Sequence, residues 1–120
     1  MKLKYFDLAR KLSVKSTHHQ HKLGCVIVKK NKIVGVGFNE VKTHTQSPHP
    51  YKMLHAEISA LLWNSYKDLE GSEAYVYRER KDGKLALAKP CSACESALRV
   101  AKIKKVYYSS ETGYQEINYV

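Results

Sequence analysis

Hydrophobic positions change their spacing from segment to segment along the chain, and each spacing predicts an element of secondary structure. Residues 2–14 place apolar side chains three or four positions apart with lysines between them, which predicts an amphipathic helix. Residues 22–30 and 32–38 are rich in valine and isoleucine. They flank Lys30 and Asn31, a pair compatible with a tight turn, so we expect a β-hairpin.

The second half of the chain continues to alternate between helical and strand-like patterns. Residues 55–66 carry apolar side chains at helical spacing and predict a second helix. Residues 73–80 alternate, and their composition predicts a central strand that is covered on both sides. Residues 91–101 predict a third helix, and residues 106–108 and 117–120 predict two further strands. This order of elements predicts one α/β domain.

Two glycines interrupt the second strand of the expected hairpin. Gly35 and Gly37 alternate with Val34, Val36 and Phe38, so both glycines lie on one face of the strand. Because that face lacks side chains there, another group can approach it closely. A helix or the substrate would fill this role.

Composition narrows the class of protein. The chain has 120 residues, the size of one domain, so residues 1–120 are treated as a single unit. The hydrophobic content of 43% is enough for a packed core, but no apolar run approaches the roughly 18 residues of a membrane span. The polar start of the chain does not resemble a signal peptide, and we expect a cytoplasmic protein without membrane contacts.

The net charge of +10 favours phosphorylated or polyanionic partners, with a solvated basic surface as the alternative.

The three cysteines differ in their surroundings. Cys25 lies in an apolar run and is expected to be a small buried hydrophobic residue. Cys91 and Cys94 form a C-x-x-C pair preceded by Pro90, a pattern shared by zinc sites and redox pairs. The odd count argues against a framework of disulfides.

The C-x-x-C pair is matched by a second motif, His55-Ala56-Glu57. One imidazole and two thiolates, from His55, Cys91 and Cys94, are good zinc ligands and leave a fourth position for water, as in a catalytic site. Glu57 would stay off the metal and transfer protons. Because His55 and Glu57 converge only at the end of a helix, we expect two helices to point their N-termini at one metal ion.

The H-A-E and P-C-S-A-C motifs resemble the signature of the zinc-dependent cytidine deaminase superfamily, H-x-E followed by P-C-x-x-C. The segments H-H-Q-H-K-L-G-C-V-I-V and V-Y-Y-S-S are similar to those of compact, phage-type dCMP deaminases. The resemblance covers nearly the whole chain. It implies a three-layer α/β/α fold with a central mixed sheet of about five strands, in which the second and third helices present the metal.

The resemblance also implies roles for individual residues. It implies zinc-dependent hydrolysis of a cytosine nucleotide, dCMP to dUMP and ammonia, with Glu57 as the proton carrier. Asn39 would contact the sugar of a small-molecule nucleotide, although an asparagine there also suits a turn that ends a strand. Backbone groups near Ala56 and Cys91 would hold the pyrimidine edge. Members of this superfamily commonly self-associate, so a homo-oligomer is expected.

Other functions stay open. The charge also fits deamination of a base in tRNA or single-stranded nucleic acid, although no basic run is interleaved with aromatic residues at a recognisable spacing. A zinc-binding module without catalysis is a third interpretation, but a structural site has no use for Glu57. His18, His19 and His21 could bind a second metal, line the substrate mouth, or form an exposed polar loop.

Three cations are candidates for contact with a substrate phosphate. Lys42 and Lys52 belong to a proline-containing loop just before His55. Arg78 ends the predicted central strand, where it could reach a phosphate or lie in solvent.

Overall fold

The computed structural model of the protein describes residues 1–16, 22–39, 55–63, 68–80 and 82–119. The order of helices and strands agrees with the prediction. The elements are α1 (Leu3–Ser13), β1 (Lys22–Lys29), β2 (Lys32–Phe38), α2 (Ala56–Trp63), β3 (Glu73–Glu79), α3 (Ser92–Val100), β4 (Lys105–Ser110) and β5 (Gly113–Asn118). Among the described residues, no helix is long and apolar enough to cross a membrane.

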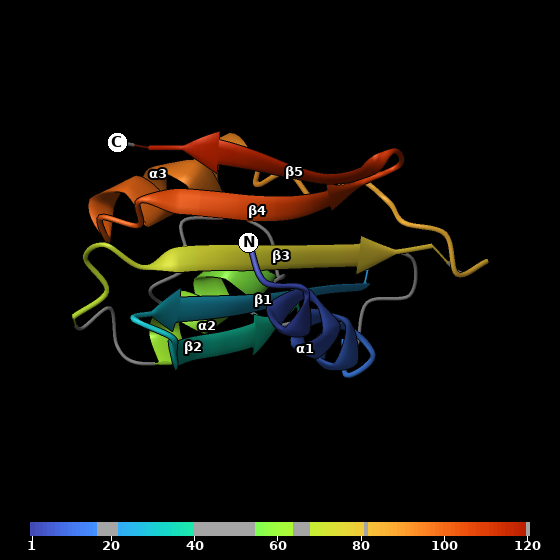
Figure 1. Ribbon diagram of the computed structural model, residues 1–120, viewed down its shortest axis with the longest axis horizontal. Helices are drawn as coiled ribbons and strands as arrows, with labels where there is room; N and C mark the ends of the chain where they lie inside the picture. The colour runs from blue at the N-terminus through green and yellow to red at the C-terminus, as the bar shows by residue number, and fades with distance from the viewer. Residues whose placement is uncertain (17–21, 40–54, 64–67, 81, 120) are drawn as a thin grey trace.

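The five strands form one mixed sheet in the order β2-β1-β3-β4-β5. β3 pairs in parallel with β4, and the other neighbouring strands pair antiparallel. α1 covers one face of the sheet, while α2 and α3 lie on the opposite face (Figure 1). The predicted three-layer α/β/α fold, with β3 at its centre, is therefore confirmed.

The sheet divides the buried core into two parts. Side chains of β3 alternate between them, with Ala74 and Val76 on the side of α2 and α3, and Tyr75 and Tyr77 on the side of α1. Cys25 is fully buried in the first of these clusters, as predicted. The alternation explains why β3 is apolar on both faces, since each face packs against a helical layer.

The β1–β2 hairpin turns at Lys30 and Asn31, where φ is 51° and 63°. Positive φ at both central residues is typical of a type I′ turn, whose twist matches that of the flanking strands. Asparagine adopts this conformation more readily than most residues. The hairpin register pairs Cys25 with Gly37.

Helix α2 packs directly on β2 over the two glycines of that strand. A Cβ at Gly37 would lie 2.4 Å from the Ala60 nitrogen and 2.6 Å from the Ala56 oxygen. A Cβ at Gly35 would lie 2.5 Å from the Ala60 oxygen. Of the two groups proposed to approach this face, the helix is the one observed. The glycines therefore set how closely the first turns of α2 approach the sheet.

The boundaries of the last two strands differ from the prediction. β4 extends beyond the predicted 106–108 at both ends, and β5 begins before the predicted 117–120 and ends at Asn118. The turn between them is shorter than residues 109–113, because the ladder continues until Ser110 pairs with Gly113. Most side chains of β5 are exposed. Hydrophobic alternation therefore could not reveal where this edge strand begins.

The helices show two smaller differences. Leu3, one of the apolar residues whose spacing predicts the first helix, is 61% exposed. At 100° per residue it lies roughly 120° around the helix axis from the buried Ala9, which faces the sheet. The predicted second helix, residues 55–66, is observed as α2, and residues 64–67 lie outside the described part of the chain.

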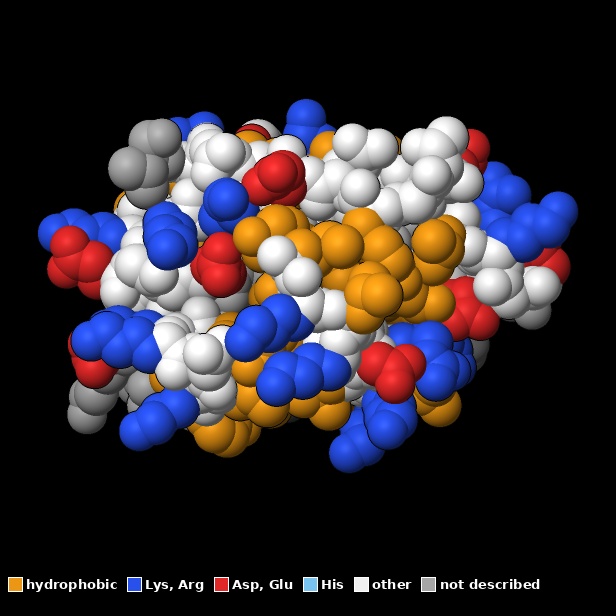
Figure 2. All heavy atoms as spheres, viewed as in Figure 1, with side chains coloured by type: hydrophobic (Ala, Val, Ile, Leu, Met, Phe, Trp, Pro, Cys, Tyr) orange, Lys and Arg blue, Asp and Glu red, His pale blue; other side chains and the backbone are white. Residues whose placement is uncertain are grey.

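The face that carries α1 has a central apolar patch (Figure 2). Leu3, Phe6, Tyr77 and Tyr114 line a surface cavity on this side of the sheet. Basic and acidic side chains are mixed around the patch, and the basic ones form no continuous stripe on the face shown in Figure 2. On this face the positive charge fits a solvated surface better than a groove for a polyanion.

Candidate active site

Two helix N-termini meet at the three predicted metal ligands. His55 immediately precedes α2, Cys91 is the N-cap residue of α3, and Cys94 lies in the first turn of α3. His55 Nδ1 lies 3.8 Å from the Sγ atom of Cys91 and 3.4 Å from that of Cys94. Ligand atoms of all three residues lie within 4.8 Å of one another. The expected convergence of two helices on one metal site is confirmed.

The observed distances fit one tetrahedral zinc ion. Zinc bonds of about 2.0–2.1 Å to nitrogen and about 2.3 Å to sulfur separate neighbouring ligand atoms by roughly 3.6 Å. The two N···S distances, 3.4 and 3.8 Å, lie on either side of that value. Burial raises the pKa of the Cys94 thiol, so its thiolate form needs a cation beside it. The donor set, one imidazole and two sulfurs, suits Zn²⁺.

Glu57 lies beside this cluster as the second residue of α2. Its side chain is buried, and burial raises the pKa of the carboxyl to about 7, partly opposed by hydrogen bonds from its own backbone and from Cys94. Among the residues that the structure describes, the buried Oε1 atom has no hydrogen-bond partner. Because a buried oxygen without a partner is costly, its presence here fits a group whose partner is a water molecule or a ligand.

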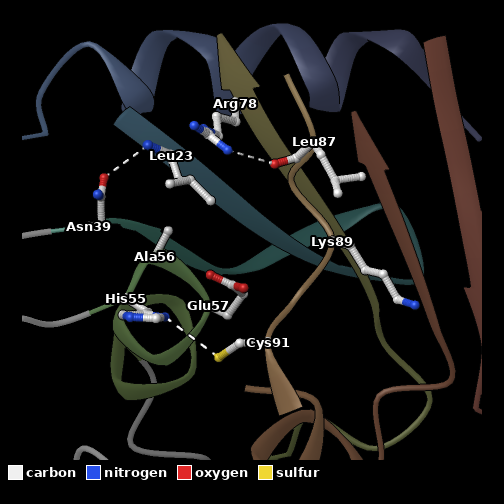
Figure 3. Close-up of a pocket in the computed structure, with 9 residues that line it drawn as sticks. All are labelled: Leu23, Asn39, His55, Ala56, Glu57, Arg78, Leu87, Lys89 and Cys91. Carbon is white, nitrogen blue, oxygen red and sulfur yellow. Dashed lines mark hydrogen bonds between the residues drawn. The ribbon is translucent and has the colours of Figure 1, made fainter. Parts of the chain in front are cut away.

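A cavity of about 250 Å³ opens at the metal ligands. Figure 3 shows His55, Glu57 and Cys91 at one end and Arg78 at the other. The walls come from β1, the end of β2, the start of α2, and the segment that runs from β3 to α3. The described lining residues are Leu23, Asn39, His55, Ala56, Glu57, Arg78, Leu87, Lys89 and Cys91.

Asn39 lines the cavity and also ties the ends of β1 and β2 together. Its Oδ1 accepts a hydrogen bond of 2.9 Å from the Leu23 N–H, and its own N–H donates to the Leu23 oxygen at 3.3 Å. These two hydrogen bonds show Asn39 in the structural role of an asparagine at the end of a strand. Contact with a nucleotide sugar stays a prediction, as does the role of the buried Ala56 in holding the pyrimidine edge.

Three lining residues were not identified from the sequence. Leu23, Leu87 and Lys89 line the cavity, but their side-chain types do not indicate a site. The position of Lys89 just before Pro90 was a usable signal, because it places a cation next to a metal ligand. The predicted roles of five residues that lie outside the described part of the chain stay predictions: His18, His19, His21, Lys42 and Lys52.

The amino-acid sequence is similar to that of a known protein family and of several known proteins. A family model described as the cytidine and deoxycytidylate deaminase zinc-binding region matches residues 1–110. The chain is 30% identical over 117 residues to a protein of Aliivibrio fischeri named "Uncharacterized deaminase in luxG 3'region", covering 91% of this chain and 72% of the relative. It is 25% identical over 129 residues to the deoxycytidylate deaminase of Mycobacterium phage D29, and the match covers 90% of this chain and 93% of the phage protein.

The fold also resembles that of a solved deaminase. The dCMP deaminase from the cyanophage S-TIM5, crystallised in complex with dCMP and dUMP, matches with a TM-score of 0.68 and 28% sequence identity. The match covers 90% of this chain and 82% of the cyanophage chain. The likeness therefore extends over the sheet and its helical layers, beyond the two short motifs.

Proposed function

Because the chain belongs to the cytidine and deoxycytidylate deaminase family and is a zinc-dependent hydrolase of that family, we propose that it converts dCMP to dUMP with release of ammonia. Two similar proteins, from a mycobacteriophage and a cyanophage, carry the name of this activity, and the second was crystallised with dCMP and dUMP. The observation that carries the proposal is the position of Glu57, whose buried Oε1, without a hydrogen-bond partner among the described residues, lies beside the three metal ligands.

Deamination replaces the amino group at C4 of cytosine by an oxygen atom from water. His55, Cys91 and Cys94 would hold the zinc ion, which would supply the Lewis-acid chemistry that activates this water. Glu57 takes one proton from the water and delivers it to N3 of the ring. The water oxygen bonds to C4, Glu57 passes the second proton of the water to the amino group, and the C4–N bond breaks as ammonia leaves. Cytosine and water thus become uracil and ammonia.

The geometry of the described residues supports this assignment. Glu57 is not part of the cluster of three ligand atoms, so its carboxyl can change its protonation state. Its side chain is buried at the cavity wall, where few water molecules can compete for its proton. We assign contact with the sugar to Asn39 and contact with the pyrimidine edge to the backbone near Ala56, since both residues line the same cavity.

The partner is therefore proposed to be a free nucleotide. Deamination of a base in tRNA or single-stranded nucleic acid is the alternative, and the substrates of the assay distinguish the two. A homo-oligomer stays a prediction.

The test is an ammonia-release assay on zinc-loaded protein. The substrates are dCMP, CMP, deoxycytidine, cytidine and a cytosine-containing single-stranded oligonucleotide. Glu57→Gln preserves the shape of the side chain but removes the proton carrier, so we expect it to retain zinc and to lose roughly 100- to 10,000-fold in kcat on dCMP. The control, Glu70→Gln, makes the same change at an exposed residue that is ion-paired with Lys102 and absent from the described cavity lining, and it should retain the native rate.

Two results would contradict the proposal. A native rate in Glu57→Gln would remove Glu57 from the mechanism. Turnover confined to the oligonucleotide would replace the nucleotide by nucleic acid as the substrate.

A further inference from the structure

Strand β3 places one arginine at the cavity. Side chains alternate along the strand, so Arg78 shares a face with Ala74 and Val76, which belong to the core beneath α2 and α3. The metal ligands precede or belong to α2 and α3, so they lie on this same side of the sheet. Arg78 lies just beyond the last parallel pair of β3 and β4, Val76 with Tyr108. β3 therefore directs a cation toward the side of the sheet that carries the metal ligands, at the point where the parallel pairing of β3 with β4 ends.

Hydrogen bonds hold the backbone of Arg78 in place. Its N–H donates to the Ser109 Oγ at 3.0 Å, and the Ala86 N–H donates to the Arg78 oxygen at 3.0 Å. Ser109 is fully buried, and its hydroxyl donates to the Ala86 oxygen at 2.9 Å. The end of β3, the segment that returns toward α3, and β4 are thus joined at one point.

The guanidinium group is also oriented. Its Nη1 donates a hydrogen bond of 3.2 Å to the Leu87 carbonyl oxygen, on the returning segment. Figure 3 shows this guanidinium at the opposite end of the cavity from His55 and Glu57. Because the protein itself holds the arginine, little side-chain freedom remains to be lost when a ligand binds.

The charges around the cavity favour an anion at this end. Among the described lining residues, Arg78 and Lys89 are cationic, and Glu57, at the metal end, is acidic. The Lys89 side chain extends away from the other labelled residues in Figure 3. A planar guanidinium matches the oxygens of a phosphate with paired N–H donors, which a lysine does not. Arg78 therefore has both the position and the chemistry to receive a phosphate.

We propose that Arg78 binds the 5′-phosphate of the substrate and so makes the enzyme select a nucleotide over the corresponding nucleoside. The inference rests on the proposed function, since a cytosine whose C4 reaches the metal ligands leaves its sugar phosphate toward the other end of the cavity. Arg78 is thus a specificity-determining residue, separate from the groups that move protons.

The experiment compares substrates that differ only in the phosphate. Values of kcat and KM are measured for dCMP and deoxycytidine with the native protein, Arg78→Met and Arg78→Lys. Arg80→Met is the matched control, because it removes an exposed cation two positions away, ion-paired with Glu111 at 3.0 Å and absent from the described cavity lining. Binding of dUMP and deoxyuridine, measured by calorimetry, provides the same comparison without turnover.

We expect Arg78→Met to raise KM for dCMP and Kd for dUMP by roughly 10- to 100-fold, the usual size of a lost charge-assisted hydrogen bond. Values for deoxycytidine and deoxyuridine should stay native, and Arg78→Lys should recover part of the affinity for dUMP. Arg80→Met should behave as the native protein for every ligand.

Three outcomes would overturn the inference. Equal losses for the nucleotide and the nucleoside would show that Arg78 only supports the structure, and native values for dUMP would show that it binds no phosphate. If Arg78→Met instead lowered activity on a cytosine-containing oligonucleotide alone, the phosphate would belong to nucleic acid. Native protein without turnover of dCMP would refute the proposed function itself, and this inference with it.

Discussion

Replacing Gly37 by alanine tests how β2 positions the active site. The added Cβ would lie 2.4 Å from the Ala60 nitrogen and 2.6 Å from the Ala56 oxygen, both of them backbone atoms of α2. Ordinary contact begins at 3.4 Å, so α2 must move away from the sheet by about 1 Å. Since a helix backbone is rigid over one turn, the movement includes the turn that carries Glu57 and follows His55.

Two effects of this movement can be estimated. Overpacking a close-packed interior costs about 1–3 kcal/mol, and we expect the upper value, about 3 kcal/mol, because two backbone atoms are involved. For a domain of this size the loss lowers Tm by roughly 10–15 °C. Zinc–ligand distances tolerate deviations of about 0.2 Å. A displacement of His55 by about 1 Å from Cys91 and Cys94 should therefore weaken zinc binding by at least roughly 10-fold.

Urea denaturation in the presence of a chelator measures the free energy of unfolding, and competition with a chromophoric chelator measures zinc affinity. Gly71→Ala is the control, because its Cβ would meet no atom within 4 Å although its φ of 80° strains any other residue. It should lose about 1–2 kcal/mol of stability and retain native zinc affinity. If Gly37→Ala showed native stability and native zinc affinity, α2 would not rest on β2 as described, and the reasoning would be refuted.

Three further substitutions probe other parts of the structure. Cys94→Ser should reduce bound zinc, measured by metal analysis, to a small fraction of the native content, because a hydroxyl is a poor zinc ligand. The far-ultraviolet circular dichroism should stay unchanged. A native zinc content would contradict the assignment of Cys94 as a metal ligand. Ser109→Ala deprives the partly buried Arg78 N–H of its acceptor and should lower the free energy of unfolding in urea by about 2 kcal/mol; a change under about 0.5 kcal/mol would mean that the backbone N–H finds another partner. Tyr75→Phe removes the hydroxyl that accepts the Lys2 N–H at the start of α1, so thermal unfolding should show a loss of about 1 kcal/mol while zinc affinity stays native. A loss of zinc affinity in Tyr75→Phe would contradict the separation of the two core clusters.

The sequence predicted the elements and the metal ligands because both depend on local chemistry. Helices and strands follow from the spacing of apolar residues, which is why α1, the hairpin and β3 were located correctly. His55, Cys91 and Cys94 could be predicted as metal ligands because imidazole and thiolate groups suit zinc, and because C-x-x-C and H-x-E are each short enough to be set by one helix turn; the structure places the three residues together. The three-layer arrangement itself came from the resemblance to a known family.

Other features became visible only in the folded structure. The exposed β5 carries no hydrophobic alternation, so only its pairing with β4 reveals where it starts. Gly35 and Gly37 indicated a close approach, but the contact with α2 depends on which face of the sheet the helix covers. These outcomes follow from packing between distant segments, which no local pattern encodes.

The cavity itself is the clearest case. The cavity is lined by residues that lie far apart along the chain: Asn39, Ala56, Arg78 and Lys89. They come together because the sheet order places β1 between β2 and β3, and because the segment between β3 and α3 is hydrogen-bonded to β4. Before the fold was known, Arg78 could equally have faced solvent. The direction of the Arg78 side chain depends on the alternation of side chains along β3 and on the face of the sheet that α2 and α3 cover. The residue type alone predicts neither.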